Sequence, residues 1–119
     1  MIRPTAAADI FIPEEWTEEQ LMMKQMTLDF VEQRILPKLE EIDNQEEGLV
    51  PSLMRESGEL GLLGSSVPEE YGGMGLDFKT TMLITEAIGG AHAFSVSFSA
   101  HTGIGTLPIL YYGNEEQKK

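Results

Sequence analysis

The sequence predicts an all-α, bundle-like domain, and three observations carry this prediction. Residues 17–20 read Thr-Glu-Glu-Gln, a capping box in which the Thr and Gln side chains each bond a backbone N–H of the first helical turn. Between Leu21 and Ile42 apolar residues recur at intervals of three, four and seven, as on one face of a helix. Asp77 precedes another apolar series and suits a helix N-cap.

Length and composition fit one folded domain. The chain has 119 residues, of which 41% are hydrophobic, and this is too apolar for a disordered segment. The net charge of −12 argues against nucleic acid and against an anionic membrane surface, because few cations could neutralise phosphates. The absence of cysteine excludes disulfides and thiolate chemistry and fits a reducing compartment.

The first half of the chain predicts an arm followed by two helices. We expect residues 1–16 to form an N-terminal arm that docks through Ile10, Phe11, Ile12 and Trp16, and residues 17–119 to form the domain. The first helix starts after Thr17 and should kink at Pro37, which lacks the N–H that bonds Gln33. Its four apolar neighbours Met22, Met23, Met26 and Phe30 are interpreted as core filling.

A second helix is expected from Pro51, and a long glycine-rich loop should follow it. The buried side of this helix is predicted to be Leu53, Met54, Leu60 and Leu63, with Gly58, Gly61 and Gly64 weakening and ending it. Residues 65–76 contain Gly72, Gly73 and Gly75 but lack the preceding strand and the Gly-Lys-Ser/Thr of a phosphate-binding loop. We therefore interpret these glycines as turn residues with positive φ.

A third helix is expected after Asp77, and an uncharged stretch follows it. The face predicted to be buried comprises Phe78, Met82, Leu83, Ile84, Ala87 and Ile88. Residues 87–114 contain no charged side chain, yet their serines, histidines and glycines make them too polar for a transmembrane helix. We expect a central helix over about residues 91–102, enclosed by other protein and broken by Gly103 and Gly105. The small side chains of this helix can border a cavity.

The end of the sequence is unexpected for a complete domain. Residues 114–117 read Asn-Glu-Glu-Gln, a second capping box that announces a helix two residues before the sequence stops. We expect the chain to be the front part of a longer protein.

The sequence contains no persuasive catalytic or metal-binding group. His92 and His101 lie nine residues apart with no carboxylate between them, whereas a metal site needs three or more ligands. Ser95, Ser97 and Ser99 belong to no nucleophile-elbow pattern. We assign no catalytic, cofactor-binding or metal-binding residue.

Several segments in order resemble the N-terminal domain of acyl-CoA dehydrogenases. Residues 61–76, Gly-Leu-Leu-Gly-Ser-Ser-Val-Pro-Glu-Glu-Tyr-Gly-Gly-Met-Gly-Leu, are similar to the family's Gly-Leu-X-Gly and Pro-Glu-Glu-Tyr-Gly-Gly-X-Gly signature. Residues 30–37 and 112–118 resemble its first-helix pattern and its Gly-X-X-X-Gln-Lys motif. Residues 100–105, Ala-His-Thr-Gly-Ile-Gly, look closest to the long-chain or very-long-chain branch.

The resemblance implies an activity, a cofactor and partners. It implies an FAD-dependent enzyme that oxidises fatty acyl-CoA to 2-enoyl-CoA in lipid β-oxidation, passes electrons to an electron-transferring flavoprotein, and forms a homo-oligomer, tetramer or dimer. The family's catalytic carboxylate and most flavin contacts belong to a middle and a C-terminal domain that are absent here, so this piece alone should be inactive. Its acyl-pocket helix maps onto Val96, Ser97, Ala100, His101 and Ile104.

Two alternatives stay open from the sequence. A stand-alone helical module that binds a protein or a lipid without redox chemistry would also explain a helix of small side chains. An acyl-CoA oxidase shares the layout of this end of the family. The resemblance implies a cytoplasmic enzyme if the source is bacterial and a mitochondrial matrix enzyme if it is eukaryotic.

Overall fold

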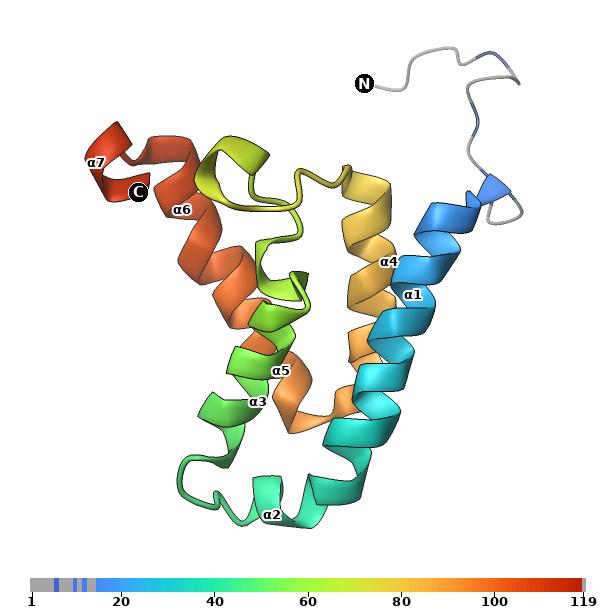
Figure 1. Cartoon of the computed structure of the whole chain (residues 1–119), viewed down its shortest axis with the longest axis vertical. Coiled ribbons are helices and arrows are strands. Elements are labelled where there is room, and N and C mark those ends of the chain that lie inside the picture. Colours follow the sequence, from blue (N-terminus) through green and yellow to red (C-terminus); the bar gives the residue numbers. More distant parts are fainter. Residues whose placement is uncertain (1–5, 7–9, 11, 13–14, 119) are drawn as a thin grey trace.

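The computed structural model describes residues 6, 10, 12 and 15–118, and the regular secondary structure of this part is entirely helical (Figure 1). The all-α prediction is therefore confirmed. Helix α1 (Glu18–Phe30) begins at the predicted capping box. The Thr17 hydroxyl accepts the Gln20 N–H at 3.2 Å, and the Gln20 side chain accepts the Thr17 N–H at 3.0 Å.

The first helix changes its winding before it reaches Pro37. A π-helical segment, η3 (Val31–Ile35), follows α1, and a 3₁₀ turn, η4 (Leu36–Lys38), contains the proline and leads into α2 (Leu39–Asp43). The Leu36 N–H already donates to the carbonyl of Val31, five residues back. The predicted interruption is present, but it begins one turn earlier than the proline requires.

The middle of the chain contains the second and third predicted helices. Helix α3 (Leu49–Glu59) starts two residues before Pro51 and is followed by the 3₁₀ turns η5 (Leu62–Gly64) and η6 (Glu69–Tyr71). Helix α4 (Phe78–Ile88) begins at the predicted N-cap, because the Asp77 carboxylate accepts the Thr80 N–H at 2.8 Å. The turn η7 (Gly89–Ala91) ends it.

The uncharged stretch forms a helical rod that is longer than predicted. Helix α5 (Ala93–Ser99) passes through a second π-helical segment, η8 (Ala100–Gly105), into α6 (Thr106–Tyr112). The prediction that Gly103 and Gly105 break the helix is wrong, because the wide π turn accommodates both. Beyond the rod, the predicted second capping box is confirmed at α7 (Glu115–Lys118), where Asn114 accepts the Gln117 N–H at 2.9 Å.

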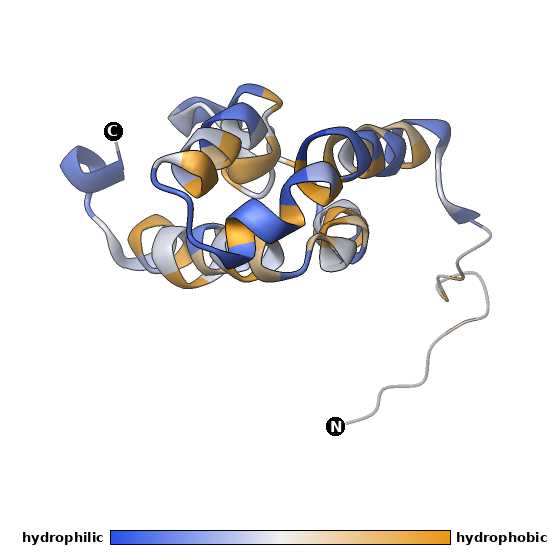
Figure 2. Cartoon of the chain, turned by 90° about the horizontal axis from the view of Figure 1, so that it is seen from below, coloured by the Kyte–Doolittle hydropathy of each residue, from blue (hydrophilic) through white to orange (hydrophobic). Residues whose placement is uncertain are grey.

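The longer helices of the body run in two opposite directions. Helices α1 and α4 lie side by side and run the same way, whereas α3 and the rod run the other way (Figure 1). The Gln20 amide donates to the Thr80 hydroxyl at 3.0 Å, which ties the starts of α1 and α4 together. Figure 2 shows hydrophobic residues along the body helices and a hydrophilic α7.

The core is centred on Phe94 of the rod. Its ring is fully buried and lies 6.0 Å from the Phe30 ring and 6.5 Å from the Phe98 ring, measured between centroids. The remaining buried members of this cluster come from every part of the body: Val31, Ile35, Ile42, Leu53, Leu62, Ile84, Ile88 and Ala91. The inner side of the rod is therefore fixed by aromatic packing.

Several residues that we predicted to be buried are exposed. Phe78 is 78% exposed and Met82 is 48% exposed, because α4 turns inward only the other four residues of the predicted face, Leu83, Ile84, Ala87 and Ile88, for which burial is confirmed. Leu60, Leu21 and Met22 are exposed too, and Met22 is not core filling. In the arm, Ile10 and Ile12 are exposed, whereas Phe11 and Pro13 lie outside the described residues; docking of the arm stays a prediction.

Replacing Phe94 should destabilise the whole domain. Removing a fully buried aromatic side chain leaves a cavity, so we expect Phe94→Ala to lower the free energy of unfolding by about 3–5 kcal/mol in urea titrations. The matched control is Val96→Ala, two residues away on the exposed side of the same helix. Equal losses in the two variants would contradict this assignment of the core.

The Asp77 cap should give stability a dependence on acidic pH. Its hydrogen bonds to Thr80 hold the pKa of the carboxyl below its usual value of 3.8. The stabilisation is therefore present above the unfolded-state pKa and is lost as the pH falls through the lower native pKa. We expect Asp77→Ala to cost about 1 kcal/mol at pH 7. That deficit should shrink on acidification, and a pH-independent deficit would contradict the argument.

Candidate functional site

The rod formed by α5, η8 and α6 has a covered side and an open side. Phe94 and Phe98 of the rod are buried against the other helices, as is Ala91 just before it. Val96 is 69% exposed and Ile104 is 83% exposed, and neither α5, η8 nor α6 carries a charge. The described residues thus leave an uncharged helical surface uncovered, and the expectation of a helix enclosed on all sides is wrong for this part of the chain.

The structure divides the five residues that the sequence predicted for an acyl pocket. Val96, Ala100 and Ile104 are exposed along the rod. Ser97 is half-buried, one residue further round the helix. His101 is exposed but lines a neighbouring groove. Three of the five can therefore form one open surface, while Ser97 and His101 border it.

The π-helical segment coincides with the centre of this surface. It spans Ala100–Gly105 and so contains three of the five predicted residues. The Thr106 hydroxyl donates to the carbonyl of His101 at 2.7 Å, and the Thr106 N–H also reaches that carbonyl. Segments of this winding are rare and frequently lie at functional sites. Nothing in the sequence pattern signalled it.

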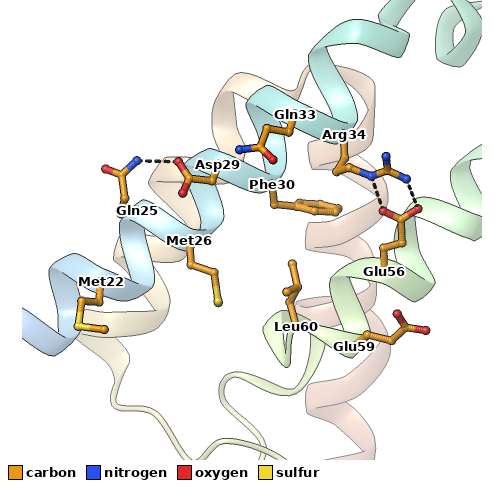
Figure 3. A pocket seen from close by; sticks show the side chains of 10 residues that line it. All are labelled: Met22, Gln25, Met26, Asp29, Phe30, Gln33, Arg34, Glu56, Glu59 and Leu60. Atoms are coloured by element: carbon orange, nitrogen blue, oxygen red, sulfur yellow. Dashed lines mark hydrogen bonds and ion pairs between the residues drawn. The ribbon is translucent and has the colours of Figure 1, made fainter.

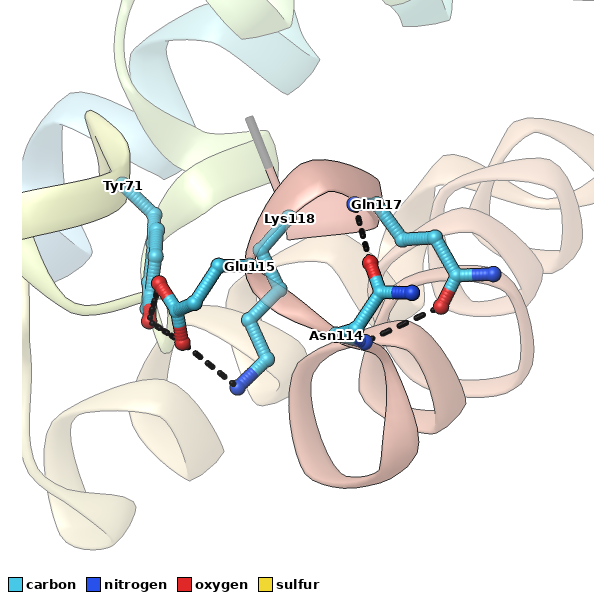
Figure 4. Close-up of polar contacts among 5 residues, drawn as sticks. All are labelled: Tyr71, Asn114, Glu115, Gln117 and Lys118. Carbon is cyan, nitrogen blue, oxygen red and sulfur yellow. Dashed lines mark hydrogen bonds and ion pairs between the residues drawn. The ribbon is translucent and has the colours of Figure 1, made fainter.

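A groove of about 510 Å³ lies beside the rod, and sequence reasoning missed it. Its walls come from the loop before α4, from the rod and from α7: Val67, Tyr71, His101, Gly105, Thr106, Ile109, Leu110, Gln117 and Lys118. The Tyr71 hydroxyl donates to the Glu115 carboxylate at 3.1 Å, and the Lys118 ammonium lies 5.4 Å from the centre of the Tyr71 ring (Figure 4). Partial burial and this hydrogen bond raise the pKa of Tyr71.

The loop that carries Tyr71 is held by its own backbone. Its amides donate within the loop: Gly73 to Pro68, Gly75 to Val67 and Leu76 to Ser65, at 2.8–3.1 Å. Gly72 and Gly75 have φ of +82° and +60°, so the prediction of turns with positive φ is confirmed for these two. Gly73 is needed for space instead, because a Cβ there would lie 2.0 Å from the Val67 carbonyl oxygen.

A second groove, of about 700 Å³, lies between α1–η3 and α3 (Figure 3). Met22, Met26, Phe30 and Leu60 give it apolar walls. At one end the Arg34 guanidinium donates to both oxygens of Glu56 at 2.7 and 2.8 Å. This bidentate pair lowers the pKa of Glu56 and raises that of Arg34, and it joins the two helical segments.

In the part of the chain that the structure describes, no three His, Asp or Glu side chains come close enough to hold a metal ion. His92 precedes α5 and adopts a φ of +50°, whereas His101 lies in η8 and lines the groove beside Tyr71. No helix among the described residues is long and apolar enough to cross a membrane.

Comparison with known proteins identifies the family. The sequence model of the family described as acyl-CoA dehydrogenase, N-terminal domain, matches residues 17–119. The chain belongs to this family. A probable acyl-CoA dehydrogenase of Bacillus subtilis (strain 168) is 45% identical over 119 residues, which are all of this chain and 20% of that relative.

Two solved structures share the fold of the domain. The acyl-CoA dehydrogenase complexed with FAD from Bacillus anthracis matches with a TM-score of 0.90 at 47% identity, over 92% of this chain and 19% of that one. A structure described as the electron transferring flavoprotein of Acidaminococcus fermentans matches with a TM-score of 0.78 at 35% identity, over 90% and 28%. The chain thus spans about a fifth of the length of the Bacillus relatives.

Adding one methyl group at Gly73 should disturb the loop beside the groove. We expect Gly73→Ala to lower the free energy of unfolding by about 1–3 kcal/mol, because the new Cβ collides with the backbone of Val67. Gly90→Ala is the control, since no atom lies within 4 Å of a Cβ built there. If urea titrations show equal stability for both variants, the inference that this loop is tightly packed is wrong.

Proposed function

We propose that this chain is the N-terminal helical part of an FAD-dependent acyl-CoA dehydrogenase that converts fatty acyl-CoA to 2-enoyl-CoA. The observation that carries the proposal is the match to the FAD-complexed Bacillus anthracis enzyme, with a TM-score of 0.90 at 47% identity. Relatives with 34% to 45% identity also carry acyl-CoA or glutaryl-CoA dehydrogenase names. The reacting groups then lie outside this chain.

Within that enzyme, the open surface of the rod would form one wall of the acyl-chain pocket. Val96, Ala100 and Ile104 offer apolar or small side chains with no charge beside them, as a hydrocarbon tail requires. Their exposure supports the proposal, because the surface is not filled by the chain's own neighbours. The opposite wall must come from outside the described residues. Ser97 and His101 would border the tail rather than line its centre.

We infer that the glycine-rich loop is not a flavin site. The glycine-rich loop could offer amides to the phosphates of FAD, but its amides are already bonded to Pro68, Gly64, Val67 and Ser65. The space beside the Cα of Gly73 is filled by the backbone of Val67. We therefore assign FAD binding to polypeptide beyond this domain. When bound there, the flavin would accept the hydride, and this domain would position the acyl chain.

The proposed partners follow from the family. We propose that the whole enzyme passes electrons to an electron-transferring flavoprotein and that it is a homo-oligomer, tetramer or dimer. The bacterial relatives favour a cytoplasmic enzyme. The small side chains around Ala100 favour long acyl chains.

A bulky side chain on the open surface should shorten the accepted substrate. In the full-length, flavin-loaded enzyme, we expect Ala100→Phe to lower kcat/KM for long acyl-CoA substrates by at least about tenfold relative to short ones, because the ring occupies space used by the tail. The assay measures reduction of an electron acceptor across a series of chain lengths.

The control is Ser99→Phe, at an exposed position about 100° round the same helix. An unchanged chain-length profile in Ala100→Phe would reject the proposed wall. A full-length gene product that purifies without flavin and does not oxidise acyl-CoA would reject the proposed enzyme and favour a protein- or lipid-binding module.

A further inference from the structure

One side-chain hydrogen bond spans the π-helical segment of the rod. The carbonyl of His101 accepts the Thr106 hydroxyl at 2.7 Å, across five residues, and it also accepts the Thr106 N–H. Thr102, one turn earlier, makes a different bond: its hydroxyl donates to Phe98 at 3.0 Å, across four residues. The second pattern is ordinary for threonine in an α-helix, whereas the first needs the wider turn.

The wide turn decides how the open surface continues along the rod. A π turn inserts one residue relative to a regular α-helix, so returning it to α geometry would rotate the following residues by about 100°. Val96 lies before the turn and Ile104 lies inside it. In a regular α-helix each step of four residues advances by about 40°, so Val96, Ala100 and Ile104 would drift by about 80° round the rod, whereas the wider turn keeps Ile104 closer to the line of Val96 and Ala100. A backbone that relaxes to regular α geometry would carry Ile104 further round the rod, away from Val96.

We propose that Thr106 is a positioning residue for acyl-chain specificity, an inference that rests on the proposed function. Its hydroxyl holds the His101 carbonyl in the wide turn and so keeps the surface of Val96, Ala100 and Ile104 continuous. Thr106 itself need not contact the substrate, because it is half-buried and lines the adjacent groove. A tail short enough to stay on one side of the turn would not sense the change, whereas a longer tail that crosses it would.

The test compares three variants in the full-length, flavin-loaded enzyme. Thr106→Val keeps the shape and removes the hydroxyl, Thr106→Ser restores the hydroxyl, and Thr102→Val removes the ordinary bond one turn away. We expect Thr106→Val to change the ratio of kcat/KM between long and short acyl-CoA by about fivefold, the effect of one lost hydrogen bond. Thr106→Ser should restore the ratio, and Thr102→Val should leave it unchanged.

The controls separate this inference from the proposed function. Flavin content and thermal unfolding are measured for every variant, since a merely structural role would lower activity equally at all chain lengths. An equal loss at all lengths, or the same shift in Thr102→Val, would overturn the role of Thr106. If Ala100→Phe shifts the profile and Thr106→Val does not, this inference alone fails. If neither variant shifts it, the proposed acyl wall fails as well.

Discussion

The packing of Phe94 between Phe30 and Phe98 is the contact on which the rest of the structure depends. Phe94 and Phe98 are four residues apart, so they share one side of the rod, and Phe30 brings α1 against them. Burial of these rings determines which side of an otherwise uncharged helix faces inward. The opposite side, with Val96 and Ala100, is then left open by geometry rather than by any polarity of its own.

Exposing an uncharged, apolar helix surface to water is unfavourable, so the open side of the rod is expected to be covered by a ligand or by other protein. Large exposed apolar areas on a folded domain mark binding sites or interfaces. Here the surface combines exposed aliphatic side chains with small ones, and a π turn lies at its centre. Family membership and the open surface thus support the same role, one wall of a site for a hydrocarbon chain.

Local features of the fold could be predicted from the sequence, while surface exposure could not. The caps at Thr17, Asp77 and Asn114 were predictable because each joins a side chain to a backbone group three residues away. The exposure of Phe78 and Met82 was not, because periodicity shows that a helix has an apolar face but not which neighbours cover it. The π turn also left no pattern, since Gly103 and Gly105 suggest a break as readily as a wide turn.

The candidate site was predicted from family resemblance more than from physics. The resemblance placed Val96, Ala100 and Ile104, which the structure leaves exposed on the rod, together with Ser97 and His101, which it sets to the side. The groove beside Tyr71 was missed because it brings Tyr71 against Glu115, 44 residues further along the chain, and no local spacing reveals such a contact. The charged pair of Arg34 and Glu56 was missed because its two residues are 22 apart and lie on different helical segments.

The most direct measurement is photocrosslinking of a bound tail. A fatty acyl-CoA that carries a diazirine at the end of its chain would be bound to the full-length, flavin-loaded enzyme, irradiated, and mapped by peptide mass spectrometry. We expect labels within residues 93–105, lost on competition with unlabelled long-chain acyl-CoA. Competable labels confined to other parts of the enzyme would show that the tail runs elsewhere and that the rod is not its wall.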